Sequence, residues 1–325
     1  MTLTQALNGA LHQVMEEDEQ VICIGEDIAA NGGVFQVTQG LEGQFGAARV
    51  IDTPISETAF IGMAVGAAMT GLKPVVELMF CDFAGVCFDQ ILNQAAKARF
   101  LSNGRVKLPL VIRTTMGAGD GSGAMHSQSL HGLFASIPGL TVVCPSTPAD
   151  AAGLLKAAIQ IDDPVIFMEN KQLYGVEGLV DEQLPLVPFG TARSARSGSD
   201  ITIVAVSAMI QTALAAAQAL ADEGVSAEVI DPRTIKPLDI GTINNSVKKT
   251  GRLLVLDEGA AYGGFADAVI AAVSGDMFGR LKAAPRKLTP PDTPVPYAVM
   301  AEKFWLPNAQ DVIKIVKTMM KGVAQ

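Results

Sequence analysis

The chain has 325 residues and a mass of 33.9 kDa, which is enough for two domains that each bury a core. Apolar residues make up 49% and charged residues 18%, as in a folded α/β protein and unlike a disordered one. The net charge is −9 and the sequence has no basic cluster, which argues against nucleic acid as a partner.

The mean hydropathy of +0.32 is high for a soluble monomer. No run approaches 18 apolar residues, so we expect no membrane span and attribute the hydropathy to buried interfaces. The first residues are typical of a capped amphipathic helix rather than of a signal peptide. The cysteines show no CxxC pairing, which favours buried free thiols and a reducing cytoplasm: Cys23, Cys81, Cys87 and Cys144.

Helix and strand patterns alternate through the first half of the chain. Hydrophobic periodicity predicts helices at 4–17, 59–71, 88–101 and 149–159, and strands at 21–24, 74–78, 108–113, 141–143 and 164–168. Strands joined by helical crossovers are parallel and are covered on both faces. We therefore expect an α/β fold whose N-terminal domain is a mostly parallel sheet with helices on both faces.

The second half repeats the alternation as a smaller α/β domain. The predicted strands are 201–206, 227–231 and 253–257, and the predicted helices are 208–222, 239–249 and 265–278. Between the halves, Gly, Pro and charged residues gather and the periodicity disappears. The expected organisation is a domain at 1–175, a linker at 176–200 and a domain at 201–325.

One carboxylate stands at the start of an unusually apolar helix. Pro54 and Ser56 are turn and N-cap residues, Glu57 follows them, and the predicted helix at 59–71 has almost no polar face. A helix that is apolar all round belongs in an interior, where Glu57 has to meet a hydrogen-bonding partner. The alternative is that Glu57 only complements the helix dipole and caps amide groups.

The Gly-rich segment 117–123 fits neither of two well-known motifs. A dinucleotide fingerprint needs a third glycine three positions after Gly119, where the sequence has Ser122. A magnesium motif of thiamine-diphosphate enzymes needs an Asn some 25 to 30 residues after Gly-Asp-Gly. The nearest downstream Asn is Asn170, so the magnesium motif around Asp120 is incomplete.

Four segments occur together in the order of one family: Asp52–Glu57, Glu77–Phe83, Asp89–Lys97 and His126–Ser129. With them the chain resembles the β subunit of the E1 component of 2-oxoacid dehydrogenase complexes, a thiamine-diphosphate family, over essentially its whole length. The resemblance implies a transketolase-like fold, with an N-terminal pyrimidine-binding domain and a C-terminal domain of the transketolase type.

The resemblance also implies that the chain carries half of a cofactor site. The diphosphate of thiamine diphosphate and the Mg²⁺ would be held by a separate α subunit, and the aminopyrimidine by this chain. Glu57 matches the family's catalytic glutamate, which hydrogen-bonds N1′ of the aminopyrimidine and promotes the tautomer that removes the proton from the thiazolium C2. Such a carboxyl group has to be buried to share a proton with the ring.

Two further residues match functional positions of the family. Phe83 matches the residue that stacks on the aminopyrimidine, although a phenylalanine at the end of a strand is by itself typical of a core. His126 matches a histidine that lines the entrance and assists lipoyl acylation, although a structural role is equally compatible with its local context. We expect Asp120 and its neighbouring glycines to form a mobile surface loop near that entrance, and His12 and His131 to be structural.

Family members of this type also hold potassium by main-chain carbonyl groups. Alignment by motif puts these carbonyls at Leu110, Ala158, Ile159, Ile161 and Asp163. Carbonyl ligands leave no side-chain signature, so the residues themselves do not reveal the site. The alternative for the Asp162-Asp163-Pro164 turn is an ordinary helix stop.

Several segments look more similar to acetoin dehydrogenase E1 β subunits than to pyruvate dehydrogenase ones: Glu77–Phe83, Arg113–Thr115, His126–Leu130 and Pro291–Tyr297. Residues 257–264 depart from this pattern, because they lack the acetoin-type Asn-Pro-Arg and are nearer to the pyruvate type. The expected substrate is acetoin first, pyruvate second and a branched-chain 2-oxoacid third. In each case the acyl unit would pass to the lipoyl group of E2, within an α2β2 assembly with E1 α.

Two other interpretations remain open. A non-catalytic scaffold subunit would keep the fold and bind no cofactor, but the joint presence of Glu57, Phe83 and His126 argues against it. A transketolase-like sugar enzyme on two chains would need several His and Arg residues for a sugar phosphate, and this chain has only three histidines.

Overall fold

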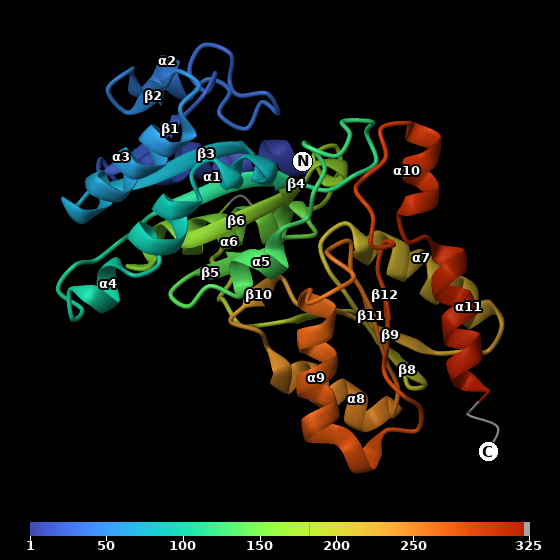
Figure 1. Ribbon diagram of the computed structural model, residues 1–325. Coiled ribbons are helices and arrows are strands. Elements are labelled where there is room, and N and C mark those ends of the chain that lie inside the picture. Colours follow the sequence, from blue (N-terminus) through green and yellow to red (C-terminus); the bar gives the residue numbers. More distant parts are fainter. Residues whose placement is uncertain (182, 322–325) are drawn as a thin grey trace. The chain divides into compact units, whose positions relative to one another are not determined.

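Two α/β units make up the fold, each with its own sheet (Figure 1). The computed structural model describes residues 1–181 and 183–321. The first unit contains Met1–Met116 and Leu133–Phe189, and the second contains Gly117–Gly132 and Gly190–Gln325. The segment 117–132 therefore belongs to the second unit by its contacts, although it lies within the first half of the sequence.

The sheet of the first unit is parallel throughout the strands that this unit contributes. In space these strands follow the order β5, β6, β4, β3, β1, β2, and every neighbouring pair is parallel. Their carboxyl ends therefore meet at one edge, where ligands of α/β proteins gather. The strands are β1 (Val21–Gly25), β2 (Val50–Asp52), β3 (Lys73–Phe80), β4 (Val111–Met116), β5 (Thr141–Val143) and β6 (Val165–Asn170).

Helices connect these strands. Helix α1 (Leu3–Glu17) begins with a capping box between Thr2 and Gln5, and it packs its apolar face against α6 (Pro148–Gln160). The remaining helical segments of this unit are α2 (Leu41–Phe45), α3 (Glu57–Met69), η1 (Cys81–Gly85), η2 (Gln90–Ala95), α4 (Ala98–Leu101), α5 (His131–Ala135), which begins at the border with the second unit, and η3 (Lys171–Leu173).

Two expectations for this unit are wrong. The predicted helix at 88–101 is interrupted, because η2 is a π-helix with five-residue hydrogen bonds such as Ala96 N to Ile91 O at 3.0 Å. The apolar helix α3 is buried on one side only and exposes Ala59, Met63 and Gly66. Periodicity cannot reveal the inserted turn, nor can an apolar sequence distinguish a helix inside a core from one that lies against a sheet.

The second unit is built around a smaller sheet in the order β12, β11, β8, β9, β7. Its pairs are parallel except that β7 runs antiparallel to β9. Strand β7 lies inside the segment 176–200 that the sequence assigned to a linker. The strands are β7 (Arg193–Arg196), β8 (Ile201–Ala205), β9 (Ala227–Asp231), β11 (Leu253–Leu256) and β12 (Arg286–Leu288), and the unit also contains β10 (Thr234–Lys236).

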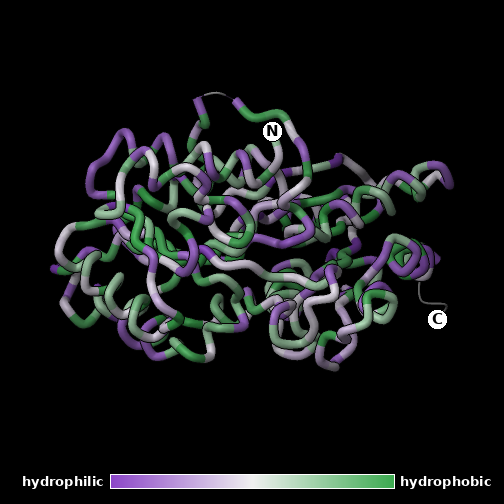
Figure 2. Tube along the Cα trace, turned by 90° about the horizontal axis from the view of Figure 1, so that it is seen from above, coloured by the Kyte–Doolittle hydropathy of each residue, from purple (hydrophilic) through white to green (hydrophobic). Residues whose placement is uncertain are grey.

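The helices of the second unit bury apolar residues on this sheet. Its core combines strand residues such as Ile203 and Val229 with helix residues such as Leu220 and Val316. In both units hydrophobic residues gather in the interior and hydrophilic ones in surface segments (Figure 2). The helical segments are α7 (Met209–Asp222), α8 (Ile240–Thr250), α9 (Phe265–Met277), η4 (Phe278–Arg280), α10 (Val299–Trp305) and α11 (Ala309–Met320).

These units confirm the predicted fold of two α/β domains with mostly parallel sheets. All four cysteines are buried and free, as expected. Across residues 1–181 and 183–321, no helix combines the length and the apolar character that crossing a membrane requires.

Candidate active site

Glu57 opens α3 and is buried, with 9% of its surface exposed. The predicted helix start is therefore confirmed, but the N-cap is not made as expected. The side chain of Ser56 caps no amide of α3, and its hydroxyl instead donates to the carbonyl of Pro54 at 2.9 Å. The Glu57 carboxyl group thus lies at the N-terminal end of α3.

A second carboxylate, Glu26, lies near Glu57. Glu26 directly follows β1, at the carboxyl edge of the parallel sheet. The pKa of Glu26 is raised, first by burial and then by the nearby charge of Glu57. A hydrogen bond from the backbone of Ser56 lowers this pKa but does not cancel the two effects. Its Oε1 is buried and has no hydrogen-bond partner among the described residues. Sequence reasoning missed Glu26, and its place directly after a strand was the available signal.

Phe83 lies in η1, which follows β3, and its side chain is partly exposed. The ring packs edge-on against Phe80 with 5.5 Å between centroids. The first turn of α3 is tied to this segment, because Thr58 Oγ1 donates to the carbonyl of Val86 at 2.7 Å. Burial and the charge of Glu57 raise the pKa of Cys87 to about 12, so this thiol also lies near Glu57. Glu57 and Phe83 thus belong to one region of the first unit.

A buried charge network joins the neighbouring strands of the same sheet. Arg113 on β4 contacts Glu77 on β3 at 2.8 Å and makes a two-pronged pair with Glu169 on β6 at 2.7 Å. The hydroxyl of Tyr174 donates to Glu169 at 2.7 Å. The pKa of Glu77 is raised, because the effect of burial outweighs the opposing effect of the Arg113 charge. The network cross-links the strands whose carboxyl ends carry the candidate site.

His126 lies in the second unit, on the segment 117–132, which we call the His126 loop. Hydrogen bonds close the loop at its neck, where Gly117 N–H donates to the carbonyl of Gln128 at 3.1 Å, and near its tip, where His126 N–H donates to the carbonyl of Gly123 at 3.3 Å. The expectation of a surface loop holds for Asp120, which is exposed, but not for Gly117 and Gly123, which are buried.

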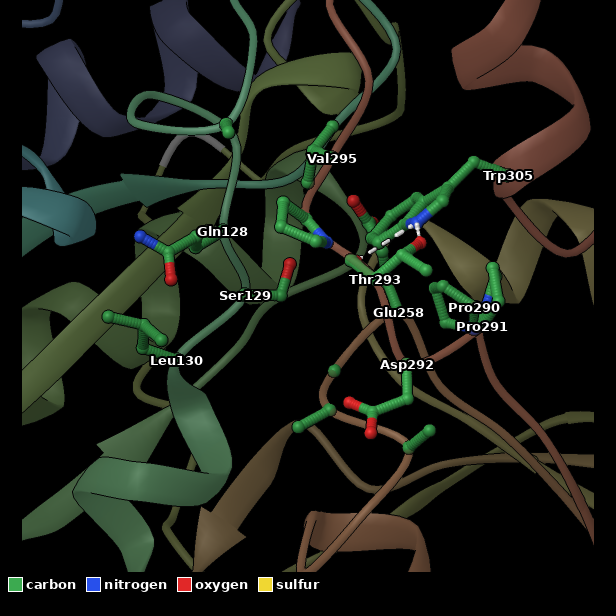
Figure 3. Close-up of a pocket in the computed structure, with 15 residues that line it drawn as sticks. Gln128, Ser129, Leu130, Glu258, Pro290, Pro291, Asp292, Thr293, Val295 and Trp305 are labelled. Carbon is green, nitrogen blue, oxygen red and sulfur yellow. Dashed lines mark hydrogen bonds between the residues drawn. The ribbon is translucent and has the colours of Figure 1, made fainter.

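A cavity of about 380 Å³ lies beside the His126 loop, within the second unit (Figure 3). One wall is formed by Gln128–Leu130, and the opposite wall by Pro290–Val295 and Trp305. The indole N–H of Trp305 bonds the hydroxyl and the carbonyl oxygens of Thr293 at 3.1 and 3.3 Å, which fixes that wall. Ser129 Oγ has no partner among the described residues. The cavity thus combines apolar walls with a few polar groups.

The other two histidines, His131 and His12, each contact a polar side chain, as expected for structural residues. His131 is buried with its Nε2 at 2.9 Å from Asp257 Oδ1. Burial lowers the pKa of His131, but the charge of Asp257 outweighs it and leaves the pKa raised. His12 Nδ1 lies 2.6 Å from Gln44 Oε1 near the surface.

The residues expected to bind potassium lie close to the end of α6 and the start of β4. Ala158 and Ile159 are in the last turn of α6, whose final carbonyl groups have no partner within the helix. The carbonyl of Leu110 accepts a hydrogen bond from Val165 N–H at 2.9 Å, which ties it to the strand that follows Ile161 and Asp163. The side chain of Asp163 is paired with Arg99 at 2.7 Å.

Comparisons with known proteins show that the two units have transketolase-type folds. The model of the transketolase pyrimidine binding domain matches residues 1–177, and that of the transketolase C-terminal domain matches residues 190–312. A solved structure described as a split gene transketolase, inactive β4 tetramer, superimposes with a TM-score of 0.81 at 25% identity, covering 99% of this chain and 98% of that one.

Relatives of similar length are found in bacteria. The β subunit of acetoin:2,6-dichlorophenolindophenol oxidoreductase of Cupriavidus necator is 47% identical, over 99% of this chain and 98% of the relative. The subunit of that name in Bacillus subtilis is 44% identical, over 98% and 97%. The pyruvate dehydrogenase E1 component subunit beta of Rickettsia bellii is 45% identical, over 98% of each chain.

Proposed function

The chain belongs to the family of E1 β subunits with transketolase-type domains, and on that premise we propose that it is the β subunit of a thiamine-diphosphate-dependent acetoin dehydrogenase. The proposed reaction cleaves the carbon–carbon bond of acetoin and transfers the two-carbon acyl unit to the lipoyl group of E2. The single observation that carries the proposal is Glu57, a buried carboxylate at the start of α3 in the same region of the first unit as the partly exposed side chain of Phe83.

The residues of the first unit fit an aminopyrimidine. The ring needs a carboxyl group at N1′ and an aromatic face to stack on, and Glu57 and Phe83 supply these two chemistries from one region. When bound, thiamine diphosphate supplies the carbanion that attacks the substrate carbonyl. Glu57 would hold the proton shared with N1′, and Phe83 would orient the ring. Burial and the nearby charge of Glu57 raise the pKa of Glu26, which lies in the same region.

His126 is proposed to act in the second half of the reaction. An imidazole is a common general acid or base, and acyl transfer to a lipoyl sulfur requires such a group. The partial exposure of His126 on its loop supports a role with a large acceptor such as a lipoylated domain. Glu57 and His126 belong to different units, and the proposal assigns them to successive steps of the reaction.

The proposed partners are an E1 α subunit, in an α2β2 assembly, and the E2 acyltransferase. The α subunit would hold the diphosphate and Mg²⁺, for which this chain has only the incomplete motif at Asp120. The apolar exposed side of α3, with Ala59, Met63 and Gly66, supports a partner chain against the first unit. Potassium bound by the carbonyls at the end of α6 is also proposed. A cytoplasmic location stays a prediction.

Pyruvate dehydrogenase activity is the second candidate. Relatives named for acetoin and for pyruvate are about equally similar to this chain, at 47% and 45% identity. Acetoin is preferred because of the motifs in the segments Glu77–Phe83 and His126–Leu130, while the segment 257–264 favours pyruvate. A branched-chain 2-oxoacid is third, and a non-catalytic scaffold is least favoured because Glu57, Phe83 and His126 are all present.

The test is the activity of this chain co-expressed with its α subunit, in the presence of thiamine diphosphate and Mg²⁺. Acetoin and pyruvate are compared in two assays, the reduction of dichlorophenolindophenol and the reductive acylation of a lipoylated E2 domain. Acetoin activity that requires Glu57 supports the proposal, and a preference for pyruvate changes only the substrate. An assembly that binds no cofactor would leave the scaffold interpretation in its place.

A further inference from the structure

A buried carboxylate far along the chain holds the first residues of the His126 loop. Glu302, on α10, is 0% exposed. Its Oε1 accepts a hydrogen bond from Gly119 N–H at 3.1 Å, and its Oε2 accepts one from Gly121 N–H at 2.8 Å. Each oxygen of the carboxyl group therefore restrains one main-chain amide of the loop.

Two adjacent carboxylates restrain the ends of the same loop. At its start, Ala118 N–H donates to Glu258 Oε1 at 2.5 Å. At its end, His131 Nε2 lies 2.9 Å from Asp257 Oδ1. The loop therefore meets three carboxylates of the second unit, all of which come from segments remote in sequence.

Glycines allow the backbone to approach α10 this closely. Gly121 has a φ of +77° and Gly123 a φ of +75°, a region in which side chains are disfavoured. A Cβ at Gly121 would lie 3.1 Å from Val299 Cγ2, and one at Gly123 would lie 3.2 Å from Tyr297 Cδ2. The Gly-rich sequence that fits no cofactor motif is thus explained by packing against the segment that carries Glu302.

The restraint extends from Glu302 to the catalytic candidate in short steps. Glu302 holds Gly121, Gly123 follows two residues later, and the carbonyl of Gly123 accepts the N–H of His126. His126 is separated from the restrained backbone by one turn of the loop. The backbone that carries the imidazole is therefore linked to the contacts that Glu302 makes.

We propose that Glu302 is a positioning residue, which through the amides of Gly119 and Gly121 sets the place of His126 for acyl transfer to the lipoyl group. The inference rests on the proposed function and adds to it a residue that touches neither substrate nor cofactor. Glu57 and Phe83 belong to the first unit, and we expect the cleavage step that they serve to be much less sensitive to Glu302.

The test compares two reactions in the assembled enzyme with Glu302→Gln, which keeps the shape of the side chain but replaces one of its two acceptor oxygens by an NH2 group that cannot accept a hydrogen bond. Misplacing a catalytic group by about 1 Å costs about 100-fold in rate, so reductive acylation of a lipoylated domain is expected to fall by between about tenfold and 100-fold. Dye reduction with the same substrate is expected to change by less than about twofold. Equal losses in both reactions, or no loss in either, would overturn the proposal.

Coupling to His126 separates positioning from a general loss of stability. In a His126→Ala background, Glu302→Gln is expected to lower the acylation rate no further, because the group that it positions is absent. Additive losses would overturn the proposal. Hydrogen exchange gives a readout without activity, since the amides of Gly119 and Gly121 are expected to exchange faster in Glu302→Gln than in the wild type.

A matched control is Asp239→Asn, which removes the charge of another carboxylate that accepts backbone amides in this unit. Asp239 accepts from Ala192 N–H and Thr242 N–H, both at 3.0 Å, and makes no contact with the His126 loop in the structure described. It is expected to leave the ratio of acylation to dye reduction at the wild-type value. A wild-type enzyme inactive in both assays would reject the proposed function itself, while faster exchange in Glu302→Gln would still establish the restraint on the loop.

Discussion

The hydroxyl of Thr58 donates a 2.7 Å hydrogen bond to the main-chain carbonyl of Val86. This contact joins the first turn of α3 to the end of η1 and so links the backbone next to Glu57 with the segment that carries Phe83. A carboxyl group and an aromatic ring that are separated in sequence are thereby held in one region. The arrangement supports a site in which one residue exchanges a proton with a flat ring and the other stacks on it.

Glu57→Gln is expected to lower both dye reduction and reductive acylation by about 10²- to 10⁴-fold, the range for loss of a general acid–base group. The amide has nearly the same size but cannot exchange a proton. Steady-state rates of the assembled enzyme measure the effect. Glu42→Gln is the control, because Glu42 is also in the first turn of a helix but is only partly buried. A Glu57→Gln enzyme that keeps half of its activity would contradict the assignment.

His126→Ala is expected to lower reductive acylation by about 100-fold, within the range for one acid–base group, and to leave dye reduction within about twofold. The reason is that the dye takes electrons without acyl transfer to a sulfur. The comparison of the two assays on one preparation tests this. His12→Ala serves as the control because His12 bonds Gln44 near the surface of the first unit. Loss of dye reduction in His126→Ala would place the residue in the first half of the reaction instead.

Arg113→Met is expected to lower the free energy of unfolding by about 3 to 5 kcal/mol, the usual cost of removing one partner from a buried ion pair. The change leaves Glu77 and Glu169 buried without their cation. Urea unfolding followed by circular dichroism measures the loss. Arg99→Met removes the more exposed pair with Asp163, and its expected cost is at most about 1 kcal/mol. Similar losses in the two variants would show that burial is not the decisive factor.

The His131–Asp257 pair is expected to make stability depend on pH in a defined window. The pKa of His131 is raised in the folded chain, so its contribution is full below its unfolded pKa of about 6.5 and is lost as the pH rises through the folded value. Burial raises the pKa of Asp257, but His131 and the amides of Gly259 and Ala266 outweigh it and leave the pKa lowered. That contribution is present above about pH 4 and is lost as the pH falls through the folded value.

The measurement is the thermal midpoint of the wild type and of His131→Gln across pH. The difference between them is expected to be largest between about pH 4 and 6.5 and to shrink as the pH rises further. A difference that grows toward high pH would show that His131 is neutral in the folded chain.

Potassium is expected to raise the thermal midpoint of the assembled enzyme more than sodium at equal ionic strength. The proposed ligands are main-chain carbonyls near the end of α6, so Asp163→Asn is expected to keep the effect. Thermal unfolding in potassium, sodium and choline chloride tests both points. Equal midpoints in the three salts would rule out a selective site in this chain.

Local sequence was sufficient for much of this molecule. The alternation of strands and helices, the parallel sheets and the start of α3 at Glu57 follow from periodicity and from turn and helix-start residues close by in the chain. The interrupted helix at 88–101 and the one-sided burial of α3 were not predictable in this way. Both depend on what the rest of the chain packs against those residues.

The arrangement around His126 was decided only by the tertiary structure. By itself, the sequence determined that residues 117–123 form a Gly-rich loop and that a histidine follows it. Its restraints come from Glu258, 140 residues after Ala118, and from Glu302, 183 residues after Gly119. Helix and strand patterns reflect neighbours within a few residues, whereas a carboxylate finds its amide partners only when packing brings distant segments together.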